Sequence, residues 1–363
     1  LETQMPAIQD KSRDDPARGN GRASPAGRDR FARVLENVGQ GLPHHPGVTD
    51  KIDVRQGFGD LHGHGHRPKL IGLGVPGDGQ AGSVHRVSPI RWRHHPELRQ
   101  PVRVTAFEGW NDAGDAASGA LRWLIHRVGA EEVATIDCED FFDFTSTRPL
   151  VTQSETGERQ ITWPDTEIWA AVTDTDHDLL FMVGQEPHLR WRTWSAAILE
   201  LAETLGVSSV ITLGALLSDI PHTRPTVVTG TADDPRVAAR LGLVRSTYEG
   251  PTGIVGVLGT ALRQAAIPTV SLWASVPTYV SSAPSPKATL ALVERATRII
   301  GVPLPTTDLE IASAAYLRQI DELVDSDEDT AAYVSDLEAA ADDQPTTDDI
   351  DGDDIDDEDS DPG

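Results

Sequence analysis

Twelve polar residues of this sequence could bind a small ligand or take part in acid–base chemistry. Their side chains combine carboxylates and imidazoles, which exchange protons, with an amide, a hydroxyl and cations that can hold an anion. They fall in loops 108–115, 184–191, 214–225, 248–253 and 275–287. The twelve residues are Glu108, Asn111, Asp112, Glu186, His188, Arg190, Asp219, His222, Arg224, Glu249, Thr252 and Lys287.

Two interpretations of this set remain open. In the first, a small polar ligand undergoes hydrolase- or phosphorylase-like chemistry, with a carboxylate as base, a histidine as acid or base, and arginine and helix N-termini holding an anion. In the second, the same residues order the loops: Asp112 and Asp115 serve a helix N-terminus, Glu186 pairs with Arg190, and His222 lies in an exposed turn. No G-x-S-x-G elbow, P-loop, H-E-x-x-H or kinase glycine loop occurs, so the sequence identifies none of these residues as catalytic.

The loops that carry these residues follow a repeated alternation of strand and helix patterns. Such an alternation predicts an α/β fold, a sheet with helices on both faces, in which ligands bind beyond the carboxyl ends of the strands. Predicted strands cover 102–106, 132–136, 178–183, 209–213, 226–228 and 269–274, and segments 148–163 and 167–172 are predicted to form an antiparallel pair with Thr156-Gly157 in the turn. Predicted helices cover 113–128, 191–205, 234–241, 254–266 and 286–300, with two short amphipathic helices in 308–340.

Composition excludes several classes of protein. The formal net charge of −26 argues against nucleic acid and anionic membrane surfaces as partners, and no apolar run is long enough for a membrane helix. The single cysteine, Cys138, excludes a disulfide framework and a multi-cysteine zinc site. Its neighbours Asp137, Glu139 and Asp140 would raise its pKa, so it is a poor nucleophile. We therefore expect a cytoplasmic protein with no metal and no cofactor.

The two ends of the chain differ from its middle. Residues 1–100 are rich in Arg, Pro, Gly and His and lack apolar periodicity, so we expect disorder or an extension upstream of the true start. The G-L-G-V-P-G string at 72–77 lacks the strand and helix of a dinucleotide site, and the histidine tract at 62–66 lacks a scaffold. The aspartate-rich segment 342–363 is expected to be a disordered acidic tail.

An aromatic loop follows the second predicted strand. It carries Phe141, Phe142 and Phe144 within an acidic segment. Three phenylalanines so close together predict either packing against the core or a protein interface.

Five ordered blocks of sequence resemble the bacterial branch of the proteasome assembly chaperone 2 family. The similarity covers roughly residues 101–340. The blocks are 107–114 (FEGWNDAG), 184–191 (GQEPHLRW), 212–225 (TLGALLSDIPHTRP), 248–254 (YEGPTGI) and 285–289 (SPKAT).

This resemblance implies a three-layer α/β/α core similar to the phosphorylase/hydrolase-like fold, a helical C-terminal extension, and self-association. The implied division is a core over 101–302, a helical extension over 303–341, and a tail from 342. Eukaryotic relatives assist assembly of the proteasome α-ring, and archaeal relatives dock on it through a C-terminal hydrophobic-Tyr-X motif. Because this sequence ends Asp361-Pro362-Gly363, we expect no docking by that motif.

The first functional hypothesis is therefore an assembly-chaperone-like protein without an assigned reaction. It would act through a protein partner or as a homo-oligomer, and it could also bind a small polar ligand. The alternative hypothesis is a hydrolase or phosphorylase-like enzyme that uses the strand-end carboxylates, histidines and arginines. Fold analogy alone does not decide between the two.

Overall fold

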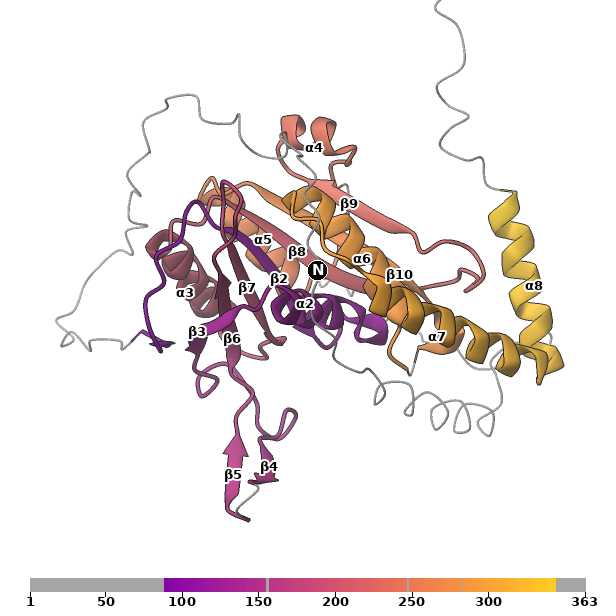
Figure 1. Ribbon diagram of the computed structural model, residues 1–363, viewed down its shortest axis with the longest axis horizontal. Coiled ribbons are helices and arrows are strands. Elements are labelled where there is room, and N and C mark those ends of the chain that lie inside the picture. Colours follow the sequence, from indigo (N-terminus) through magenta and orange to yellow (C-terminus); the bar gives the residue numbers. More distant parts are fainter. Residues whose placement is uncertain (1–87, 155–156, 247, 282, 344–363) are drawn as a thin grey trace, which may run out of the picture.

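A central sheet of eight strands organises the chain, with helices against both faces (Figure 1). The computed structural model describes residues 88–154, 157–246, 248–281 and 283–343, and the account below concerns these ranges. The strands lie in the order β1-β3-β6-β7-β2-β8-β10-β9. Their bounds are β1 Ile90–Trp92, β2 Val102–Glu108, β3 Glu131–Ile136, β6 Thr166–Ala171, β7 Leu179–Gln185, β8 Ser209–Ser218, β9 Val228–Ala232 and β10 Thr269–Pro277.

Four strands at the centre of this sheet, β7, β2, β8 and β10, run parallel to one another. β2 and β7 are buried along all but their last residue. Continuous apolar runs of this kind are typical of strands that are covered on both faces. At the margins, β1, β6 and β9 pair antiparallel to their neighbours, so the sheet is mixed.

Two pairs of helices form the outer layers. α2 (Ala116–Arg127) and α6 (Pro286–Ile300) enclose one apolar cluster with the sheet, whereas α3 (Trp191–Thr204) and α5 (Ile254–Gln264) enclose a second. The short helix α4 (Pro235–Leu241) packs beside β9. The predicted α/β class, with a three-layer α/β/α core, is therefore confirmed.

Two long helices extend the core at its C-terminal side. α7 (Thr307–Asp325) packs on α6, and its Tyr316 and Ile320 form a third apolar cluster with Val280 and Ala283. α8 (Glu328–Asp342) has one buried residue in the described chain, Val334. Besides the packing of Val334 in that cluster, polar contacts from the 214–225 loop hold α8.

Arg224 makes the main polar contact to α8. Its Nε and Nη2 donate to the two carboxylate oxygens of Asp342, at 2.9 and 2.7 Å. Tyr333 on α8 also donates to Asp219 at 3.2 Å. Two parallel N–H to oxygen contacts fix the geometry of an arginine–carboxylate pair, so Arg224 orients the last helix.

Replacing Arg224 with alanine should loosen α8 alone. Because α8 buries so little apolar surface, its amide protons (residues 328–342) should exchange several-fold faster, while those of α7 keep their protection. Hydrogen exchange measured by mass spectrometry checks this result. Arg236→Ala, at an exposed position of α4, is the control, and equal effects of the two substitutions would contradict this expectation.

A two-stranded hairpin projects from the body of the molecule (Figure 1). It consists of β4 (Leu150–Gln153) and β5 (Arg159–Thr162), and every residue of both strands is exposed. The expected pairing of 148–163 with 167–172 is wrong, because β5 pairs with β4 while β6 joins the main sheet between β3 and β7. Of the predicted turn, Thr156 lies outside the described residues, and Gly157 has a left-handed φ of 81°.

Three further expectations need correction. Residues 88–100 contain structure, since β1 pairs antiparallel with β3 through Ile90, Arg91 and Trp92. β8 and β10 run several residues beyond their predicted ends, and β9 spans 228–232 rather than 226–228. α7 is longer than the short helix predicted there.

Other predicted features at the two ends are not described. The string at 72–77, the histidine tract at 62–66 and the tail from 344 onward lie outside the described residues. None of the helices in the described ranges combines the length and apolar composition needed to cross a membrane.

Candidate functional site

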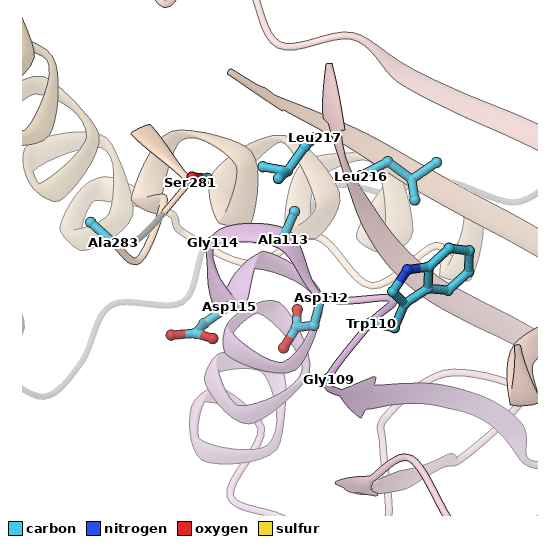
Figure 2. Close-up of a pocket in the computed structure, with 10 residues that line it drawn as sticks. All are labelled: Gly109, Trp110, Asp112, Ala113, Gly114, Asp115, Leu216, Leu217, Ser281 and Ala283. Carbon is cyan, nitrogen blue, oxygen red and sulfur yellow. The ribbon is translucent and has the colours of Figure 1, made fainter. Parts of the chain in front are cut away.

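A pocket of about 500 Å³ lies at the carboxyl end of β2 and β8 (Figure 2). This is the edge of a parallel sheet at which ligands of open α/β proteins bind. The turn after β2, the end of β8 and the segment before α6 form its walls. The lining residues are Gly109, Trp110, Asp112, Ala113, Gly114, Asp115, Leu216, Leu217, Ser281 and Ala283.

The rim of this pocket is apolar and exposed. Trp110 is 69% exposed, and Leu216 and Leu217 are 41% and 48% exposed. β8 extends beyond the end of β2: the ladder between these strands stops at Leu213, and beyond the bridge at Ala215 the two leucines pair with β10 alone. We call Trp110, Leu216 and Leu217 the apolar rim.

Close backbone packing forms the floor of the pocket. Gly114 has φ of 58°, and its carbonyl accepts from the amide of Ser285 at 2.7 Å. A Cβ at this glycine would lie 3.0 Å from the Ser285 Cβ. The next residue, Asp115, also adopts the left-handed region, with φ of 48°. Gly114 thus supplies both the backbone conformation and the space that join this turn to the start of α6.

Asp112 joins the pocket wall to α2. Its Oδ1 accepts from the amides of Ala117 at 2.7 Å and Ser118 at 3.1 Å, so it serves the helix N-terminus as the second interpretation predicts. Burial raises the pKa of Asp112. Burial, followed by the charge of Glu108, raises the pKa of Asp115.

Two substitutions of Asp112 should separate its role as a hydrogen-bond acceptor from the effect of its buried charge. Asparagine keeps an acceptor for the α2 amides and removes a buried charge, so at pH 7.5 Asp112→Asn should be as stable as the original protein or more so. Alanine removes the acceptor and should cost about 1–2 kcal/mol. Because its pKa is raised in the folded state, protonated Asp112 stabilises the fold relative to the ionised form. This stabilisation is lost as pH rises through the folded-state pKa. The free energy of unfolding of Asp112→Asn, relative to that of the original protein, should therefore increase between pH 4 and pH 7.5.

Urea unfolding of both variants at pH 4 and pH 7.5 checks these results. A larger loss for Asn than for Ala at pH 7.5 would show that the charge itself holds the helix, contrary to this expectation.

Glu108 and Glu186 lie at neighbouring strand ends, and the Glu186 amide donates to the Glu108 carbonyl at 3.0 Å, but their side chains make separate contacts. Glu108 accepts from Arg122 at 2.7 Å and from Gln185. Glu186 accepts from the amide of Ile254 at 2.8 Å and so caps α5. The expected pair between Glu186 and Arg190 is wrong for this reason.

Arg190 and His188 contact the aromatic loop instead. Arg190 donates to Asp140 at 2.7 Å, and the Nδ1 of His188 accepts from the amide of Asp143 at 3.0 Å. Phe141 and Phe142 are 1% and 4% exposed and belong to the apolar cluster beneath α3 and α5. As folded, these two rings pack in the core and are not available to a partner.

His222 lies at the centre of a buried network rather than in an exposed turn. It is 3% exposed, because α7 covers it. Its two ring nitrogens lie 2.7 Å from the hydroxyl of Tyr279 and 2.9 Å from Asp321 Oδ1. Lys287 donates to the carbonyls of His222 and Arg224, both at 2.5 Å, and burial lowers its pKa. This network fastens the 214–225 loop to α6 and α7.

The remaining candidates do not converge on the pocket. Glu249 and Thr252 are exposed, and Asn111 is buried with its carbonyl bonded to the amide of Ala215 at 2.8 Å. Of the twelve candidates, Asp112 alone lines the pocket. The apolar rim was missed by sequence reasoning, although Trp110 in a turn and two successive leucines at a strand end are the signal that could have found it.

One acidic cluster has atoms close enough to suggest a metal site. The ligand atoms of Asp137, Cys138 and Asp165 lie within 4.8 Å of one another. Burial raises the pKa of the Cys138 thiol to about 12, and the carboxylate of Asp165 accepts from the Cys138 amide at 2.8 Å. The thiol of Cys138 is therefore protonated at neutral pH and is a poor nucleophile, as its acidic neighbours predict.

Comparison with known proteins identifies the family to which this chain belongs. A model of the PAC2 family matches residues 106–324, which include the pocket and most of α7. The chain belongs to the PAC2 family. The resemblance carried by the five sequence blocks is therefore confirmed.

Two bacterial relatives of known structure are similar to 64% of this PAC2 chain. A PAC2 family protein from Streptomyces avermitilis is 47% identical, with a TM-score of 0.61, over 64% of this chain and 99% of its own. A proteasome-assembly chaperone homologue from Mycobacterium tuberculosis is 43% identical, with a TM-score of 0.59 and the same coverage of both chains.

A more distant structure shares the PAC2 fold alone. PbaB of Pyrococcus furiosus, an archaeal proteasome activator, is 15% identical with a TM-score of 0.53, over 64% of this chain and 97% of its own. No curated protein matches this chain.

Proposed function

We propose that this PAC2 protein is an assembly-chaperone-like protein that holds a subunit of a larger particle through protein–protein contacts. The observation that carries the proposal is the apolar rim around the pocket. Trp110, Leu216 and Leu217 expose large apolar side chains at one edge of the sheet. A cluster of exposed aromatic and aliphatic side chains around a concave surface is typical of a protein interface.

The relatives support the choice of partner class. The Mycobacterium tuberculosis relative is described as a proteasome-assembly chaperone homologue. A subunit of the proteasome of the source organism is therefore the first partner to test. The enzyme hypothesis has less support, because Asp112 and Asp115 are the two acids or bases that line the pocket, and the Oδ1 of Asp112 is bonded to the amides of α2.

Site-specific photocrosslinking in cells of the source organism tests this proposal. Benzoylphenylalanine replaces Trp110 in one variant and Leu217 in another, and Ile311, which is 62% exposed on α7, in the control. The two rim positions should crosslink to the same protein, identified by mass spectrometry as a subunit of a multisubunit particle, and Ile311 should not.

Other outcomes would contradict the proposal. Crosslinks from the rim to a second copy of this chain alone would make the rim a self-association surface. Crosslinks to the same set of proteins from all three positions would show non-specific contact.

A further inference from the structure

Arg103 lies in the middle layer of the fold with no polar partner. The side chain is on β2, is 0% exposed, and has no hydrogen-bond acceptor for Nε, Nη1 or Nη2 among the described residues. Its register partners on the two neighbouring strands are Leu180 and Val210, both apolar members of the cluster beneath α3 and α5. The two strand positions beside Arg103 thus supply no polar side chain.

The charge of this group persists at neutral pH. Burial lowers the pKa of Arg103 to about 9, and no nearby charge contributes. By contrast, Arg99, just before the amino end of β2, is half exposed and pairs with Asp178. A buried cation without a counter-charge is costly, so Arg103 needs an anionic partner that the described side chains do not supply.

Other donors on the same side of the sheet also lack partners. Side chains alternate along a strand, so Thr105 and Phe107 lie on the same face as Arg103. The Thr105 hydroxyl is 0% exposed and unpartnered. Trp194 of α3 packs edge-on against Phe107, with ring centres 5.3 Å apart, and its Nε1 is buried and unpartnered. Ser195, the next residue of α3, is buried and has an unpartnered hydroxyl.

These groups have one chemistry in common. The guanidinium and the indole only donate hydrogen bonds, and the two hydroxyls can do so. A water molecule could accept some of these bonds but would leave the charge of Arg103 unneutralised. We propose that the layer between β2 and α3 binds a small dehydrated monovalent anion, of the size of chloride or bromide, through Arg103 with Thr105 and Trp194.

This inference is independent of the proposed function, because the anion would act inside the core, away from the apolar rim. It predicts that halide ions stabilise the folded state specifically. At a halide concentration about one hundred times the dissociation constant, the thermal midpoint should rise by roughly 5–10 °C above that in sodium gluconate of equal ionic strength.

The first test is anomalous diffraction from crystals of the full chain grown with sodium bromide in place of sodium chloride. A bromine peak within hydrogen-bond distance of the Arg103 guanidinium would support the site. A bromine map with no peak there, whatever bromide sites occur on the surface, would overturn it.

The second test compares thermal unfolding of Arg103→Met with that of Arg192→Met, a substitution on the exposed side of α3. Arg103→Met should lose the saturable halide dependence, and Arg192→Met should keep it. The same halide dependence in both variants would overturn the proposal. If Arg103→Met fails to fold, the bromide map of the unsubstituted protein decides the question alone.

Discussion

Replacing Trp110 with alanine should reduce capture of the protein partner at least 30-fold while the fold stays intact. Interface tryptophans commonly contribute about 2 kcal/mol or more, which corresponds to about 30-fold in affinity. Trp110 is 69% exposed, so its removal leaves no cavity in the core. The measurement is quantitative mass spectrometry of the partner that copurifies with each variant, together with thermal unfolding.

Trp163 provides the matched control for this substitution. It is also a partly exposed tryptophan, 46% exposed, but it follows the projecting hairpin and packs edge-on against Phe144, with ring centres 5.1 Å apart. Trp163→Ala should leave partner capture within about two-fold of the original protein. An equal loss from both substitutions would assign the effect to general exposure of apolar surface rather than to the apolar rim.

Replacing Asp178 with alanine should lower the free energy of unfolding by about 3 kcal/mol. This carboxylate is 1% exposed and lies just before β7. It accepts from the backbone amide of Arg99 at 2.7 Å, from Nη2 of the same arginine at 2.8 Å, and from the amide of Thr173 at 2.9 Å. Alanine would leave the two backbone amides without their acceptor at the amino end of the sheet.

The pH dependence of stability gives a second signature of Asp178. Burial alone would raise its pKa, but Arg99 and the backbone donors outweigh burial and lower it. A lowered folded-state pKa means that the stabilisation is present above the ordinary value of about 3.9 and is lost as pH falls through the folded value. Asp178→Asn should therefore lose less stability than the original protein below about pH 4.

Urea unfolding between pH 2.5 and 7 measures this difference. Asp176→Asn, at a neighbouring acidic position, is the control and should follow the original curve. A parallel decline of Asp178→Asn and the original protein would contradict the role assigned to this carboxylate.

The sequence predicts the layers of this fold well because periodicity reports burial directly. The apolar runs at 178–183 and 209–213 correspond to β7 and β8, and the spacing of Trp194, Ile198 and Leu201 corresponds to α3. Ser285 followed by Pro286 marks the start of α6, and the Ser285 side chain accepts from the amide of Ala288. These signals are local, so one stretch of chain is enough to read them.

The candidate site was much less predictable, because its contacts join distant parts of the chain. Glu186 caps a helix that begins 68 residues later, and His222 contacts Asp321 of α7, 99 residues away. A sequence indicates which strand ends meet at one edge but not which loop side chain a later helix will cover. The same reason explains β1, whose three residues gain their structure from pairing with β3.

The order of strands in the sheet also has a consequence for biosynthesis. β2 is the second strand of the described chain, yet its sheet neighbours are β7 and β8, and Val102 meets Ser209 more than one hundred residues later. Such long-range pairing slows folding, because a long loop must close before the contact stabilises the chain. During synthesis on the ribosome, both edges of β2 therefore stay unpaired until β7 and then β8 emerge. A nascent chain that stops before residue 209 lacks one of the two neighbours that bury this strand.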